Sequence, residues 1–149
     1  MEEISRLGLA KSIGVSNFGI LKLSQILHNA TIPPTVNQVE MNPSWQQGKL
    51  RDFCKERDSC DCVKLGQINL VVFMHIILRS IVQQRASAVP KTFNKERMKP
   101  NLDIADWELS EDEMNKIKRI PQRRLCSAES FVSEAGPYKS LDQLWDNDP

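Results

Sequence analysis

Two groups of polar residues in this 149-residue chain have types and a spacing that could bind a ligand. In the first group, Ser16 and Asn17 follow a strand-like run and offer a hydroxyl and a primary amide, which together donate and accept hydrogen bonds. Such a pair can hold an amide group of a ligand, although Ser and Asn more commonly form a turn or cap a helix. Gln38 lies in a second strand-like run, between Val36 and Glu40. Its side chain would face either a site or the solvent, and the spacing leaves both open.

The second group is the run from Lys91 to Arg97, which follows a third strand-like run and opens a helix. The free amides and the macrodipole at a helix N-terminus attract phosphate. Lys91 and Arg97 add cationic donors, and Thr92 adds a hydroxyl. This pattern is typical of a phosphate pocket, with a solvated, charged helix start as the alternative.

No other set of residues forms a recognised catalytic or metal-binding pattern. The four cysteines, Cys54, Cys60, Cys62 and Cys126, lack a CxxC arm, and His75 adds a single imidazole. Two histidines in this layout do not support a Ser–His or Cys–His nucleophile. We therefore predict no metal site and expect reduced thiols. A thiol or metal module built on Cys54, Cys60 and Cys62 is the weakest alternative.

The composition is that of an ordinary globular protein, with 40% apolar and 26% charged residues and a net charge of +1. The basic excess of a nucleic-acid-binding protein is absent. The longest apolar stretch, within residues 70–78, is shorter than the roughly 20 residues that span a bilayer. The first residues are charged and lack the apolar segment of a secretory signal. We therefore expect a cytoplasmic protein with no nucleic-acid or membrane partner.

Helices and strands alternate over the first 56 residues, and these elements must position the first group of polar residues. Helical spacing is found over 1–10, 19–30 and 46–56, with strands predicted over 11–15 and 35–41. Strands that alternate with helices favour parallel βα units, and ligands bind at the carboxyl ends of such strands. The fold class predicted is therefore α/β.

The middle of the chain is less regular. Residues 57–77 are first polar and then apolar without a clear period, so that a buried helix and a buried strand both stay open. We predict the end of a helix over 78–85 and a short strand over 86–90. A helix then starts at Asn94, and Pro100 should cut or kink it.

The last part of the chain contains one well-signalled helix, over residues 110–120. Ser110 and Glu113 have the spacing of a capping box. Pro121 ends this helix. Residues 122–149 have scattered aromatic side chains and no strong period, which indicates a C-terminal tail laid over a surface.

Six motifs in this order resemble the aldo-keto reductase superfamily, and most of all its plant branch, which includes chalcone reductase, deoxymugineic acid synthase and galacturonate reductase. They are GLAKSIGVSNF at 8–18, NQVEMNP at 37–43, VPKTFNKERMKPNL at 89–102, DWELSEDEM at 106–114, IPQRR at 120–124 and GPYKSLDQLW at 136–145. The resemblance covers residues 1–56 and 78–149. It implies a (β/α)₈ TIM barrel that binds NADP(H) in an extended form and reduces a small carbonyl substrate to an alcohol.

The resemblance also implies roles for both groups of polar residues. Ser16, Asn17 and Gln38 would bind the nicotinamide carboxamide. The cofactor's 2′-phosphate would be bound by Lys91, Thr92 and Arg97. The adenosine side of the site would be lined by Phe93, Asn94 and Asn101.

The chain departs from the family pattern in three places. The family's catalytic Asp, Tyr, Lys and His lie in the first half of the barrel, which has no counterpart here, so no catalytic residue is predicted. Residues 57–77 lack the aromatic-Ser-Pro-Leu-Gly loop that follows the family's seventh strand. Pro100 also replaces a usual acidic residue.

We therefore expect residues 1–149 to form a partial reductase domain: the C-terminal part of the barrel, without its first half and its strand-7 region. Residues 57–77 would be a divergent segment within it, and 122–149 its tail. Such a chain would be inactive alone. The alternative is a non-catalytic short form that associates with a full-length relative, through exposed sheet edges, or binds NADPH weakly.

Overall fold

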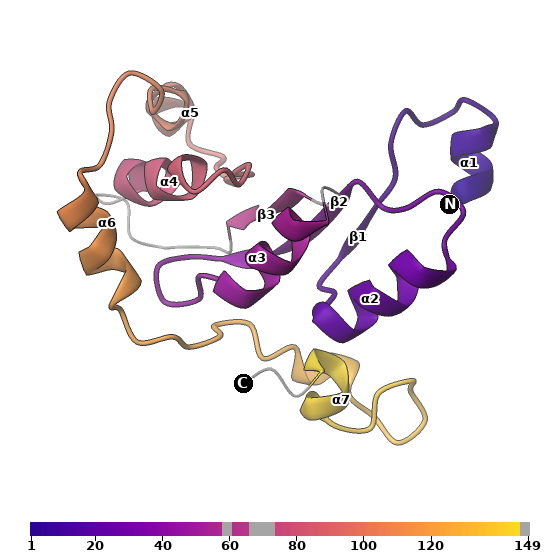
Figure 1. Cartoon of the computed structure of the whole chain (residues 1–149). Coiled ribbons are helices and arrows are strands. Elements are labelled where there is room, and N and C mark those ends of the chain that lie inside the picture. The colour runs from indigo at the N-terminus through magenta and orange to yellow at the C-terminus, as the bar shows by residue number, and fades with distance from the viewer. Residues whose placement is uncertain (58–60, 66–73, 147–149) are drawn as a thin grey trace. The chain divides into compact units, whose positions relative to one another are not determined.

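A computed structural model describes residues 1–57, 61–65 and 74–146 of the chain (Figure 1). Its elements follow one another in this order: α1 (Glu2–Arg6), β1 (Gly14–Ser16), α2 (Ile20–Asn29), β2 (Val36–Met41), α3 (Gly48–Glu56), β3 (Asp61–Leu65), α4 (Met74–Gln83), α5 (Lys95–Leu102), α6 (Glu111–Lys118), the 3₁₀ turn η2 (Glu129–Phe131) and α7 (Leu141–Trp145). No helix in the described ranges is long and apolar enough to cross a membrane.

The strands form one sheet in the order β1-β2-β3. β1 and β2 are parallel, with Gly14 opposite Val36 and Ser16 opposite Gln38. Helix α2 makes the crossover between them, which parallel neighbours require. The βα alternation predicted over the first 56 residues is confirmed, and the bounds of its elements shift by a few residues.

The chain forms two compact units, the first made of Met1–Val39, Gln47–Cys62 and Arg124–Pro149 and the second of Glu40–Gln46 and Val63–Arg123. The core of the first unit contains Leu23 from α2, Val39 from β2, and Leu50 and Cys54 from α3. Leu50 and Cys54 are four residues apart and therefore lie on one face of α3. The two helices thus cover the sheet face to which Val39 belongs.

The core of the second unit is built on α4, whose residues Ile77, Leu78 and Ile81 pack with Met41 and Ala86. Their spacing gives α4 one continuous apolar face, so the apolar run that left helix and strand open is helical from Met74 onward. Residues 58–60 and 66–73 of the predicted divergent segment lie outside the described residues.

The predicted strand over 86–90 is wrong, because the chain there closes the C-terminus of α4 instead. Arg85 has a left-handed backbone with φ 61°. Its N–H donates to the Val82 carbonyl at 2.9 Å, and the N–H of Ala86 donates to the Ile81 carbonyl at 3.2 Å. These two bonds make a Schellman cap, whose usual apolar contact is here between Ala86 and Ile81.

Helix α5 starts where predicted but is not cut at Pro100, since it continues to Leu102. The Asn94 side chain accepts a hydrogen bond from the Glu96 N–H at 2.8 Å and caps the helix. Pro100 falls in the last turn, so its missing N–H removes only the bond to the Glu96 carbonyl.

Helix α6 begins with the predicted capping box. The Ser110 N–H donates to the Glu113 carboxylate at 2.8 Å, and the Glu113 N–H donates to the Ser110 hydroxyl at 3.3 Å. The last turn of α6 is bonded to the chain that follows β2. There the side chain of Gln46 donates to the carbonyls of Pro43 and Ile117 at 2.8 and 2.7 Å. These bonds hold the chain after β2 against the end of α6.

Candidate functional site

The polar group at the ends of β1 and β2 is brought together by the sheet register. Ser16 lies opposite Gln38, so both side chains belong to the same sheet face. The Ser16 hydroxyl donates to the Gln38 carbonyl at 2.8 Å, and the Asn17 N–H donates to the same oxygen at 3.0 Å. Three predicted site residues thus meet at one strand end.

Helices α2 and α3 cover the face of β2 that lies opposite the Gln38 side chain. Asn37, Val39 and Met41 are buried, whereas Val36, Gln38 and Glu40 are half-buried. The side chain of Gln38 therefore lies on the face away from α2 and α3. Both readings that the sequence left open for Gln38, a site and the solvent, are compatible with this placement.

The side-chain amides of Asn17 and Gln38 have no hydrogen-bond partner among the residues that the structure describes. Asn17 is exposed and has φ 59°, a left-handed backbone that Asn tolerates better than most residues. Two free amides and the lone pairs of the Ser16 hydroxyl remain available. This donor and acceptor set suits a ligand amide such as a carboxamide.

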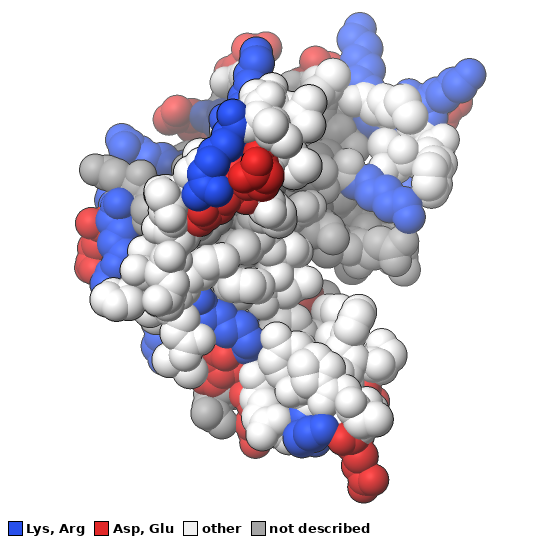
Figure 2. Space-filling model, turned by 90° about the vertical axis from the view of Figure 1, so that its right-hand side faces the viewer, with Lys and Arg blue, Asp and Glu red and all other residues white. Residues whose placement is uncertain are grey.

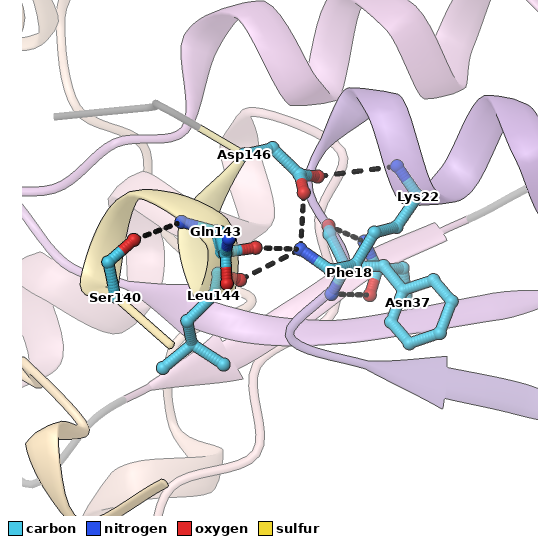
Figure 3. A network of polar contacts seen from close by, with 7 residues as sticks. All are labelled: Phe18, Lys22, Asn37, Ser140, Gln143, Leu144 and Asp146. Atoms are coloured by element: carbon cyan, nitrogen blue, oxygen red, sulfur yellow. Dashed lines mark hydrogen bonds and ion pairs between the residues drawn. The ribbon is translucent and has the colours of Figure 1, made fainter. Parts of the chain in front are cut away.

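A residue that the sequence reasoning missed, Asn37, holds the turn after β1. Its Nδ2 donates to the Phe18 carbonyl at 2.8 Å, and the Phe18 N–H donates to Asn37 Oδ1 at 3.3 Å (Figure 3). Asn37 is fully buried. The signal that could have revealed it is an Asn inside a strand, in alternation with Val39, because Asn is depleted in strands unless its amide is satisfied.

The second polar group precedes and opens α5. The Thr92 hydroxyl accepts a hydrogen bond from the Asn94 N–H at 3.1 Å, and Asn94 caps the helix. The Lys91 ammonium lies 5.0 Å from the centre of the Phe93 ring, which is 87% exposed. Arg97 is exposed one turn into the helix.

Within the described residues, Lys91 and Arg97 form no ion pair. Two free cations beside a helix N-terminus fit a phosphate group. The oxygen of Asn94 is engaged by its own helix, so its amide NH₂ is what remains for a ligand. Asn101, which the resemblance puts on the adenosine side, is half-buried near the end of α5.

The two polar groups belong to different units: Ser16, Asn17 and Gln38 to the first, and residues 91–101 to the second.

The charged side chains on one face and the potential metal ligands of the described residues indicate no second kind of site. Lys and Arg are interspersed with Asp and Glu on the face drawn in Figure 2, without a broad region of one sign. Cys54 is buried and Cys126 is exposed. No cluster of three His, Cys, Asp or Glu in that part of the chain could hold a metal ion.

Parallel strands joined by a helix define an α/β architecture, and the first polar group lies at the strand ends, where ligands commonly bind in such folds. The sequence model of the Aldo/keto reductase family matches residues 1–66. 7-acetyl-epi-neemfruitin B aldo-keto reductase of Melia azedarach is 44% identical over 171 residues, which cover 99% of this chain and 53% of the relative. Deoxymugineic acid synthase 1 of Oryza sativa subsp. japonica is 46% identical, with 99% and 54% covered. In sequence, the chain is similar to members of the aldo-keto reductase family along 99% of its length.

Solved structures show a similar fold. The aldose reductase from Schistosoma japonicum has a similar fold, with a TM-score of 0.82 and 23% identity over 94% of this chain and 52% of that chain. A Bombyx mori aldo-keto reductase in complex with NADP has a TM-score of 0.77 and 25% identity, over 88% of this chain and 52% of that one. The architecture is thus similar to about half of an aldo-keto reductase TIM barrel.

The chain spans about half the length of the curated relatives that it matches. The alignments to these relatives cover 171 residues, more than the 149 that this chain has. The relatives therefore contain residues, inside the aligned range, that have no counterpart here.

Proposed function

We propose that this chain is a cofactor-binding portion of an NADP(H)-dependent aldo-keto reductase. The observation that carries the proposal is the strand-end arrangement, in which the Ser16–Gln38 pairing leaves the Asn17 and Gln38 amides unbonded within the described residues. A primary amide such as the nicotinamide carboxamide needs both donors and acceptors, and this set supplies them.

In this proposal Ser16, Asn17 and Gln38 orient the nicotinamide through its carboxamide. When bound, NADPH would supply the hydride that reduces a carbonyl carbon. The parallel register of β1 and β2 fixes the two strand ends relative to each other, so the three side chains are pre-organised before the cofactor arrives.

The 2′-phosphate of the cofactor is assigned to Lys91, Thr92 and Arg97. Neither cation forms an ion pair within the described residues, and the capped start of α5 adds helix amides and their dipole. Phe93, Asn94 and Asn101 would line the adenosine. The relative from Bombyx mori was solved with NADP, which supports this choice of cofactor.

By itself, the 149-residue chain is proposed not to reduce carbonyl compounds. None of its residues matches the family's Asp, Tyr, Lys and His, and Tyr138 belongs to the GPYKSL motif of the C-terminal segment. Joined to the portion of the barrel that it does not cover, the chain would take part in converting a small carbonyl substrate to an alcohol. The missing aligned residues are assigned to the strand-7 region, around 57–77.

The test is a titration of the purified 149-residue chain with NADPH, followed by NADPH fluorescence, and then addition of a small aldehyde. We expect saturable binding and no steady oxidation of NADPH. A Gln38→Met variant should bind NADPH about tenfold more weakly, because it loses the one or two hydrogen bonds that the Gln38 amide makes to the cofactor. Gln25→Met, an exposed change on α2, is the matched control and should leave binding unchanged.

A second candidate, a non-catalytic partner of a full-length relative, is favoured by the sheet edge. β1 is an outer strand of the sheet, paired only with β2 in the described part of the chain. Leu7 and Leu9, which precede it, are 62% and 72% exposed. An open parallel edge favours pairing with another strand, and exposed apolar side chains favour association. Co-purification with a full-length family member would support this candidate.

A further inference from the structure

Lys22 and Asp146 join the start of α2 to the end of α7, although neither belongs to the proposed cofactor contacts (Figure 3). The Lys22 ammonium forms an ion pair with the Asp146 carboxylate, and the backbone N–H of Lys22 donates to the same carboxylate at 3.3 Å. The two side chains are 16% and 7% exposed. A pair so well shielded is screened much less than a surface ion pair.

The same ammonium also caps α7. It donates to the carbonyls of Leu144 and Gln143 at 2.8 and 3.1 Å, which are free acceptors at the helix C-terminus. A cation at that end of a helix is favourable for the macrodipole. Asp146 follows α7 in a left-handed conformation, φ 59°, which turns its carboxylate back toward Lys22.

Asp146 also lies against the backbone of Gly19, the residue that precedes α2. A Cβ placed on Gly19 would come within 2.5 Å of the Asp146 carboxylate. Only glycine admits this close approach without displacing the carboxylate. The turn from Asn17 to Gly19 is therefore held by Asn37 through Phe18 and by Asp146 at Gly19 and Lys22.

We propose that Lys22 and Asp146 are positioning residues for the turn that presents Ser16 and Asn17 to the nicotinamide. The C-terminal segment would thus set the affinity for the nicotinamide end of the cofactor without touching it. This inference rests on the proposed function. It predicts that loss of the pair lowers the affinity for NADP⁺, whose nicotinamide reaches the turn. The affinity for 2′,5′-ADP, which carries only the adenosine and 2′-phosphate side, should not change.

The test uses the 149-residue chain and its variants Lys22→Met and Asp146→Asn. Hydrogen–deuterium exchange of the peptide over 16–23 should be faster in both variants, while the peptide over 95–102 is unchanged. Affinity for NADP⁺ should fall about tenfold, and affinity for 2′,5′-ADP should stay within about twofold. Faster exchange with unchanged NADP⁺ affinity, or equal losses for the two ligands, would overturn the proposal.

Lys139→Met is the matched control. The Lys139 ammonium also donates to backbone carbonyls of the C-terminal segment, those of Glu134 and Gly136, and makes no bond to α2. We expect it to change neither the exchange of 16–23 nor NADP⁺ affinity. An equal effect of Lys139→Met would mean that general loosening of the segment is responsible, which overturns the role of the pair. Failure of the unmodified chain to bind either ligand would instead overturn the proposed function, and the exchange data would still decide whether the pair holds the turn.

Discussion

The buried Asn37 side chain bonds both polar groups of the Phe18 peptide backbone: it donates to the carbonyl at 2.8 Å and accepts from the N–H at 3.3 Å. Asn37 lies on the helix-covered face of β2, and its neighbour Gln38 lies on the other. These two consecutive strand residues have different roles, because the side chains of a strand alternate between the two faces of the sheet. One holds the turn after β1, and the other is available to a ligand.

Replacing Asn37 by Leu should destabilise the first unit by about 2–4 kcal/mol, because the half-buried Phe18 N–H and carbonyl both lose their partner. The measurement is the urea dependence of far-UV circular dichroism. Asn29→Leu is the control, since Asn29 is exposed and its side chain bonds, among the described residues, only to the nearby Gln25 carbonyl. It should stay within about 0.5 kcal/mol of the unmodified chain. Equal effects of the two substitutions would contradict the role given to Asn37.

Replacing Lys91 or Arg97 by Met should weaken NADP⁺ binding about tenfold each, because each removes a charge-assisted contact to the 2′-phosphate. Binding of NAD⁺, which lacks that phosphate, should not change. Lys99→Met, on the same helix, is the matched control. A parallel loss of NAD⁺ affinity in the Lys91 variant would contradict the phosphate assignment.

The capping box of α6 should make stability depend on pH. The Ser110 backbone N–H, and then the Ser110 hydroxyl, hold the pKa of Glu113 below its ordinary value. A carboxyl whose folded pKa is lowered stabilises the fold above its unfolded pKa, about 4.3, and loses that contribution as the pH falls through the folded pKa. Glu113→Gln should therefore reduce the loss of stability measured in urea between about pH 5 and pH 3.

Glu111→Gln is the control for this effect. Glu111 lies in the same first turn of α6 and makes no side-chain hydrogen bond among the described residues. If both variants lose stability with pH as steeply as the unmodified chain, the capping box is not the source of the dependence.

The open edge of β1 predicts that the chain is marginally stable or associates. Parallel sheets are normally closed or covered, and an exposed strand pairs with other strands. We expect the sedimentation coefficient and the midpoint of thermal unfolding to rise with protein concentration. A sharp, cooperative melt of a dilute monomer would count against this prediction.

The first βα unit was predictable because its signals are local. Leu23 and Leu27 are one helical turn apart, and Val39 alternates with Asn37 along β2. The sequence could not say which of Asn37 and Gln38 faces the helices. Both are amides in adjacent positions, and only the packing of α2 and α3 decides between them.

Other features have no local signal at all. Lys22 and Asp146 are 124 residues apart, so nothing near either one points to the other. The prediction of a strand over 86–90 was wrong for a different reason. Arg85 takes the left-handed position of a Schellman cap, which Gly usually occupies, so the sequence lacks the glycine that would have indicated the cap.

The central claim is tested most directly by calorimetric titration of the 149-residue chain with NADP⁺ and, separately, with NAD⁺. The proposal predicts one site per chain and at least about tenfold tighter binding of NADP⁺, because the 2′-phosphate meets Lys91 and Arg97 at the start of α5. No binding of either dinucleotide, or equal affinity for both, would contradict it.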